Sequence, residues 1–191
     1  MQGGRATELI LIRHAPAMAE GKLCGRTDVP ADCSDSATIA ALRRALGTPP
    51  RIITSPALRC HQTAAALWPG ATPPSDPRLW EQDFGAWEGQ SYADLPDLGP
   101  MSPETLANHR PPGGESFTDL CARISPVLAG LEPEFSTAIV AHAGTVRAGL
   151  ALALGSVPAA LAFDISPLSV TRLRALPGGN WAILCVNWTA S

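Results

Sequence analysis

Two histidines in this chain each follow a short apolar run, and an arginine precedes the first of them. Residues 9–12 lead into Arg13 and His14, and residues 138–141 lead into His142. Buried strands have continuous apolar runs of this kind, and open α/β sheets bind ligands just beyond the carboxyl ends of their strands. An arginine beside a histidine at that position suits a phosphorylated ligand, although each motif alone could be a solvated strand end.

A short β-branched run, residues 51–55, lies between these two along the chain. It stops at Ser55-Pro56 and is followed by a helical stretch over residues 57–67, with Arg59 in its first turn. From there the guanidinium can reach back over the sheet edge, beside the free N–H groups that attract anions to a helix N-terminus. We therefore expect Arg59 to meet the two histidines at one edge of a sheet.

Four motifs follow one another in a fixed order along the chain. They are Leu11-Ile12-Arg13-His14-Ala15, Ser55-x-x-x-Arg59-x-x-x-Thr63-Ala64, Trp80-Glu81-Gln82-Asp83-Phe84-Gly85-Ala86-Trp87-Glu88-Gly89 and Ala141-His142-Ala143-Gly144. Together they resemble the histidine phosphatase superfamily, also called the phosphoglycerate mutase-like family. A chance match to all four motifs in order is improbable.

The resemblance implies a role for each candidate residue. His14 would be the nucleophile that forms a phosphohistidine, and Glu81 would be the general acid that protonates the leaving oxygen. Phosphoryl transfer needs both of these groups, together with donors around the phosphate oxygens. Those donors would be Arg13, Arg59, His142 and the backbone N–H of Ala143.

Other polar residues near the motifs have weaker claims. Asp83 and Glu88 are fallback carboxylates, and we expect Glu88 to anchor the turn around Gly85 and Gly89. Arg26 is a candidate to contact the substrate, although a solvated loop arginine is the favoured interpretation. Glu115 could lie on the phosphate side, but is expected to brace its loop, and His61 and His109 are expected to lie outside the site.

The residues after the nucleophile depart from the family pattern. The family usually has a glycine, a polar residue and a hydroxyl residue there, whereas this chain has Ala15-Pro16-Ala17. The missing hydroxyl often touches the phosphate or caps the first helix. Its loss is expected to affect substrate affinity and the shape of the loop.

Composition limits the partners of this chain. Its 191 residues, 46% of them hydrophobic, fit a single domain over residues 1–191. A net charge of -3 without a basic stripe argues against nucleic acid. There is no apolar run long enough for a bilayer and no signal-peptide pattern, which favours a cytoplasmic protein without membrane contact. The five cysteines are expected to be reduced, and the cysteines and histidines lack metal-ligand spacing, so neither metal nor cofactor is expected.

The apolar periodicity predicts how strands and helices alternate. Helices are expected over residues 36–46 and 117–131, the second capped by Ser116 with Asp119, and late strands over 165–173 and 181–187. This alternation predicts an α/β fold, a three-layer α/β/α sandwich with a mostly parallel central sheet of the phosphoglycerate mutase-like type. Residues 90–112, which are rich in proline, are expected to form a lid-like insertion.

The predicted function is phosphomonoester hydrolysis of a small phosphorylated metabolite through a phosphohistidine. The short chain and the Gly114-Glu115-Ser116-Phe117 motif look most like the α-ribazole phosphatases of the cobalamin pathway, which suggests α-ribazole phosphate as substrate. Two alternatives stay open, a mutase-type phosphoryl transferase and a catalytically silent phospholigand-binding module on the same fold. A homodimer is one option for assembly.

Overall fold

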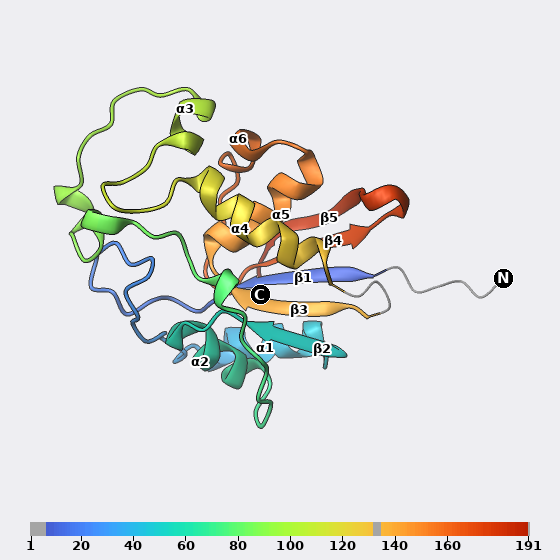
Figure 1. Ribbon diagram of the computed structural model, residues 1–191. Helices are drawn as coiled ribbons and strands as arrows, with labels where there is room; N and C mark the ends of the chain where they lie inside the picture. The colour runs from blue at the N-terminus through green and yellow to red at the C-terminus, as the bar shows by residue number, and fades with distance from the viewer. Residues whose placement is uncertain (1–6, 132–134, 191) are drawn as a thin grey trace.

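A five-stranded sheet forms the centre of the computed structural model, which describes residues 7–131 and 135–190 (Figure 1). Its spatial order is β2 (Arg51–Thr54), β3 (Thr137–Ala141), β1 (Glu8–Arg13), β4 (Val170–Ala175) and β5 (Trp181–Trp188). The helices are α1 (Ser36–Leu46), α2 (Leu58–Leu67), α3 (Pro103–Asn108), α4 (Phe117–Ala129), α5 (Ala143–Leu154) and α6 (Val157–Ala160).

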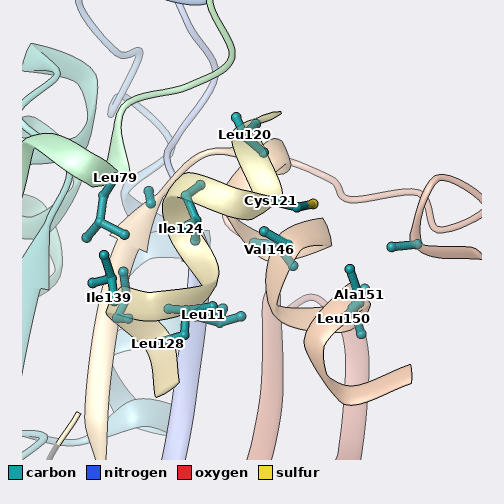
Figure 2. Close-up of a cluster of buried hydrophobic side chains, with 14 of the residues drawn as sticks. Leu11, Leu79, Leu120, Cys121, Ile124, Leu128, Ile139, Val146, Leu150 and Ala151 are labelled. Carbon is teal, nitrogen blue, oxygen red and sulfur yellow. The ribbon is translucent and has the colours of Figure 1, made fainter. Parts of the chain in front are cut away.

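Helices cover both faces of the sheet because β1 is apolar on both sides. Leu9 and Leu11 belong to the core formed with α4 and α5, part of which is drawn in Figure 2. Ile10 and Ile12 point the opposite way, as alternate residues of a strand must, into the core formed with α1 and α2. The three-layer arrangement predicted from the sequence is therefore present.

The prediction of a mostly parallel sheet is not confirmed, because the sheet is mixed. β1 and β2 both pair with β3 in parallel, whereas β4 is antiparallel to β1 and to β5. After α6 the chain returns to the end of β1, where Leu168 N–H donates to Arg13 O and Arg13 N–H donates to Ser169 O. β4 therefore starts beside the end of β1 and must run in the opposite direction.

The strand predicted over residues 165–173 begins later than expected. β4 starts only at Val170, because Leu168 takes a φ of 57° in the turn that returns the chain to β1. The helices predicted over residues 36–46, 57–67 and 117–131 are observed within two residues of those bounds. Ser116 and Asp119 form the predicted capping box at the start of α4.

Residues 90–112 contain a 3₁₀ helix, Tyr92–Asp94, and α3, and no strand. They lie at the upper left of Figure 1, on the side toward which β1 and β3 point. α3 packs against α4 and α6. A lid role for this segment stays a prediction. Within the described ranges, no helix has the length and apolar character needed to cross a membrane.

Candidate active site

The candidate residues gather around one cavity at the carboxyl ends of β1 and β3. Its volume is about 250 Å³, and its lining includes Arg13, His14, Arg59, Glu81 and Ala143. His142 lies directly beside His14, with 5.2 Å between the ring centroids. All of the site residues predicted from the sequence are thus brought together, although they come from four separate parts of the chain.

The backbone and a short hydrogen bond fix the His14 ring. His14 N–H donates to Ala141 O, which ties the residue to the end of β3. Nδ1 lies 2.6 Å from Ala15 O, and a carbonyl can only accept, so Nδ1 carries the proton. Nε2 therefore holds the lone pair and has no hydrogen-bond partner among the described residues.

Burial keeps the His14 imidazole neutral. The side chain is only 5% exposed although it lines the cavity. This burial lowers the pKa of His14 to about 3, and the charges of Arg59 and Arg13 act in the same direction, against the bond to Ala15. The imidazole is thus in the form that a nucleophile requires at neutral pH.

His142 is fully buried at the point where β3 passes into α5. Its Nε2 lies 2.8 Å from Ser55 Oγ, and Trp80 stacks parallel to its ring with 6.4 Å between centroids. Burial, followed by the effect of His14, lowers the pKa of His142 well below its ordinary value. Its buried Nδ1 has no hydrogen-bond partner among the described residues.

Arg59 is a buried cation without a carboxylate partner in the described part of the chain. It is 1% exposed and donates to two carbonyls, Gly25 O at 2.7 Å and Thr27 O at 3.1 Å. A buried charge is costly unless an opposite charge compensates it. The surroundings of Arg59 therefore favour an anion in the cavity.

Arg13 and α5 add further donors at the same place. The Arg13 guanidinium is anchored by the carbonyl of Ile165, and its buried Nε has no described partner. At the start of α5, the Ala143 N–H also has no partner in the described ranges, and such free groups attract anions.

Thr63 links α2 to the loop that departs from the family pattern. Its hydroxyl accepts a hydrogen bond from Ala15 N–H at 2.9 Å and donates to Arg59 O at 2.7 Å. The loop after His14 is thus held by a side chain from α2 rather than by a hydroxyl of its own.

Glu81 approaches the cavity from a loop. Its carboxylate accepts hydrogen bonds from Gly144 N–H at 3.2 Å and from Gln82 N–H at 3.0 Å. A Cβ atom at position 144 would lie 2.1 Å from Glu81 Oε1, so only glycine lets the carboxylate sit against the start of α5.

Arg26 does not line the cavity. Its side chain is 37% exposed, and it donates to Glu81 O at 3.2 Å and pairs with Glu115 at 3.6 Å. Burial alone raises the pKa of Glu88, but hydrogen bonds from Thr27, Arg26 and Phe84 outweigh it, and the pKa is lowered. Glu88 thus anchors the turn around Gly85 and Gly89 to the backbone of residues 25–27, which is a structural role. His61 and His109 lie outside the cavity lining, and the five cysteines are free.

Three other polar residues of the cavity carry no strong sequence signal: Lys22, Tyr92 and Arg147. Arg147 is half-buried and donates through Nε to Phe163 O at 3.0 Å. The sequence shows that Arg147 follows His142 closely, but not that its side chain lines the cavity. Among the described residues that line the cavity, four are cations and Glu81 is the only carboxylate. No cluster of metal-ligating side chains occurs in the described ranges.

The chain is similar in sequence and in fold to several phosphatases. A glucosyl-3-phosphoglycerate phosphatase of Mycobacterium tuberculosis is 29% identical, over 96% of this chain and 87% of that protein. The structure of a mycobacterial glucosyl-3-phosphoglycerate phosphatase with inorganic phosphate is 26% identical, covers 96% of this chain and 98% of that one, and superimposes with a TM-score of 0.82.

A structure from Escherichia coli, proposed to be an α-ribazole-5′-phosphate phosphatase, shares the fold. It has a TM-score of 0.81 at 20% identity, covering 97% of this chain and 98% of that one. The family model of the histidine phosphatase superfamily (branch 1) matches residues 9–189. The chain therefore belongs to the histidine phosphatase superfamily, and with phosphatases among its relatives it is a phosphoric monoester hydrolase.

Proposed function

We propose that this protein hydrolyses phosphomonoesters through a phosphohistidine on His14 Nε2. The observation that carries the proposal is the hydrogen bond from Nδ1 to Ala15 O, which leaves the Nε2 lone pair available beside a cavity rich in cations. A neutral imidazole held in one orientation is a suitable nucleophile for phosphorus.

Two steps complete the reaction. First, Nε2 bonds to phosphorus while the bond from phosphorus to the ester oxygen breaks, and Glu81 protonates that oxygen so that it leaves as an alcohol. In the second step the Glu81 carboxylate takes a proton from water, and the water oxygen bonds to phosphorus. The nitrogen–phosphorus bond breaks, its electron pair returns to Nε2, and inorganic phosphate is released.

The phosphate would be held by Arg13, Arg59, His142 and the N–H of Ala143. Support comes from the uncompensated charge of Arg59, the unpartnered Nδ1 of His142 and the free N–H of Ala143. These donors are fixed before substrate binds, which is the condition for stabilising charge that develops in the transition state. Arginine also presents paired donors that match phosphate oxygens.

We propose a small substrate with a second acidic group. The cavity is smaller than most drug-sized pockets, and Lys22 and Arg147 add positive charge beyond the proposed phosphate donors. A phosphorylated glycerate derivative has the chemistry that this charge would bind, and a relative is a glucosyl-3-phosphoglycerate phosphatase. α-Ribazole phosphate, suggested by the sequence, is the competing substrate; a role in cobalamin synthesis and a cytoplasmic location likewise stay predictions.

The proposal is tested with purified protein and a panel of phosphate esters in the presence of a chelator. The panel contains p-nitrophenyl phosphate, 3-phosphoglycerate, glucosyl-3-phosphoglycerate, glycerol 3-phosphate and α-ribazole 5′-phosphate. We expect phosphate release that resists the chelator, an acid-labile phosphoprotein on rapid quenching, and loss of both in His14→Ala. Loss of activity with the chelator would instead indicate metal-assisted hydrolysis.

The alternatives give different products. A mutase would convert 3-phosphoglycerate to its 2-isomer faster than it releases phosphate. A silent binding module would bind phosphate in calorimetry without turnover of any ester. Either result would replace hydrolysis as the proposed function.

A further inference from the structure

Residues 80–84, which carry Glu81, lie outside the helices and strands. Three main-chain bonds hold them, from Trp80 N–H to Pro77 O, from Glu115 N–H to Asp83 O and from Trp87 N–H to Phe84 O, and the other hydrogen bonds come from side chains. These residues link the 3₁₀ helices Pro77–Leu79 and Gly85–Trp87. Three consecutive N–H groups in this stretch donate to carboxylates: Gln82 to Glu81, Asp83 to Glu115 and Phe84 to Glu88. The position of Glu81 therefore depends on residues outside its own segment.

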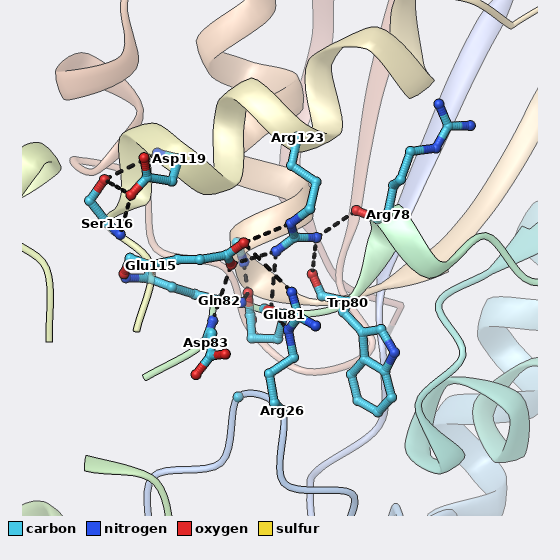
Figure 3. Close-up of polar contacts among 12 residues, drawn as sticks. Arg26, Arg78, Trp80, Glu81, Gln82, Asp83, Glu115, Ser116, Asp119 and Arg123 are labelled. Carbon is cyan, nitrogen blue, oxygen red and sulfur yellow. Dashed lines mark hydrogen bonds and ion pairs between the residues drawn. The ribbon is translucent and has the colours of Figure 1, made fainter. Parts of the chain in front are cut away.

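Arg123 of α4 binds carbonyls of this stretch and of the 3₁₀ helix before it. Nη1 donates to Arg78 O at 2.6 Å and to Trp80 O at 3.0 Å, and Nη2 donates to Glu81 O at 3.3 Å (Figure 3). The remaining donors of Nε and Nη2 go to the two oxygens of Glu115, at 2.9 and 2.7 Å. A guanidinium has five N–H donors, and all five are used here.

Glu115 joins Arg123 to the far side of the stretch. It precedes α4, and Oε2 also accepts the N–H of Asp83 at 3.2 Å, while its backbone carbonyl accepts the side-chain amide of Gln82 at 2.7 Å. Burial alone raises the pKa of Glu115, but the hydrogen bonds and charge of Arg123 outweigh it, and the pKa is lowered. Glu115 is therefore charged at neutral pH and pairs with Arg123.

We infer that Arg123 and Glu115 are positioning residues for the general acid, holding residues 78–83 so that the Glu81 carboxylate stays on the N-terminus of α5. This inference rests on the role of Glu81 in the proposed function. Neither side chain lines the cavity. They act through the carbonyls and N–H groups on both sides of Glu81, and thereby set where its carboxylate can reach.

Stabilising the fold does not by itself explain the ion pair between Arg123 and Glu115. α4 is already anchored by its apolar face, which includes Leu120, Ile124 and Leu128. The two side chains are 18% and 22% exposed, and replacing such a pair by apolar groups is often neutral for stability. An apolar residue cannot, however, replace the planar guanidinium of Arg123, which binds three carbonyls and a carboxylate at once.

The test compares Arg123→Met, Arg123→Lys and Glu115→Gln with a matched control, Arg110→Met. Arg110 pairs with Asp119 in the first turn of the same helix and forms no hydrogen bond or ion pair with residues 78–83. Each variant is assayed on 3-phosphoglycerate, whose leaving alcohol needs a proton, and on p-nitrophenyl phosphate, whose leaving group does not. A catalytic group displaced by about 1 Å can cost about 10²-fold in rate.

We expect kcat on 3-phosphoglycerate to fall by about 10²-fold in Arg123→Met and by less in Arg123→Lys, with little change in KM. p-Nitrophenyl phosphate is slowed far less, and Arg110→Met behaves as wild type. In a Glu81→Gln background, Arg123→Met has no further effect, because the group that it positions is already lost. Equal slowing of both esters, or multiplied effects in the double variant, would overturn the inference while leaving the phosphatase assignment intact.

A second measurement does not depend on activity. Because Glu81 accepts the Gly144 N–H, hydrogen exchange at Gly144 reports where the carboxylate lies. We expect faster exchange at that amide in Arg123→Met and in Glu81→Ala, which removes the acceptor, and unchanged exchange in Arg110→Met. Unchanged protection in Arg123→Met refutes the positioning role even if no ester is hydrolysed, and an inactive wild type refutes the proposed function alone.

Discussion

The two ends of the cavity are built in different ways. The phosphate end, formed by His14, Arg59 and His142, is positioned by strand ends, by the first turn of α2 and by buried hydrogen bonds. The acid end, residues 78–83 with Glu81, lies in a loop and a short 3₁₀ turn, and its backbone is bound by Arg123 and Glu115 (Figure 3).

This difference indicates which steps each end controls. Main-chain hydrogen bonds of the sheet persist through side-chain substitutions other than to proline, so the phosphate end has a fixed geometry that every phosphate ester uses. The acid end depends on a few side chains and serves only esters whose leaving oxygen needs a proton. Substitutions at the two ends should therefore differ in their dependence on the leaving group.

The largest effect is expected for Arg59→Ala at the phosphate end. Removing a fixed donor to the transition state typically costs about 10²–10³-fold in kcat. The loss should be similar for p-nitrophenyl phosphate and for alkyl esters, in steady-state assays alongside Arg44→Ala, an exposed arginine of α1. Near-wild-type kinetics would exclude Arg59 from the phosphate pocket.

Glu81→Gln should show the opposite pattern. General acid catalysis contributes about 10²-fold or more when the leaving group is a poor one. We expect that loss for 3-phosphoglycerate and little loss for p-nitrophenyl phosphate, whose oxygen is already acidic. If both esters slow equally, Glu81 is not the acid, and the contrast between the two ends fails.

Gly144→Ala tests the acid end without changing Glu81. The added methyl group would collide with Glu81 Oε1, the flexible end of a side chain, so the carboxylate should move while the fold persists. We expect about a tenfold loss on alkyl esters, with little change in melting temperature. A variant that is unstable and slow on both esters would show that Gly144 serves packing instead.

Arg147→Met separates substrate choice from the chemistry at both ends. If this cation binds a second acidic group, KM for 3-phosphoglycerate should rise about fivefold, as expected for losing a partly exposed charged hydrogen bond. KM for glycerol 3-phosphate, which lacks the carboxylate, serves as the internal control. A parallel rise for both esters would place Arg147 at the phosphate itself.

The smallest effect concerns stability of the phosphate end in acid. His14 has a folded pKa of about 3, so between that value and about 6.5 the unfolded chain binds a proton that the folded chain does not. Stability is complete above about pH 6.5 and falls as the pH drops. Between pH 7.5 and 5.5, wild type should lose about 1 kcal/mol more than His14→Gln in urea unfolding. Equal losses would mean that His14 is not held neutral.

Local signals in the sequence were sufficient for most of the phosphate end. Apolar runs that end at His14 and His142 predict strands, and carboxyl ends of parallel neighbours lie at one sheet edge. Arg59 in the first turn of a helix could be placed for the same reason. The direction of β4 could not, because it depends on where a turn at Leu168 returns the chain to β1.

The amino-acid sequence by itself determined the family, the three layers and the residues that meet at the cavity, because short-range periodicity and motif order encode them. Only the tertiary structure decided how Glu81 is held, how His14 is tied to the end of β3 and which way β4 runs. Each of these depends on contacts between residues far apart in the chain: Arg123 with Trp80, His14 with Ala141 and Leu168 with Arg13. No local pattern specifies such pairs, because their distance is set by how the layers pack.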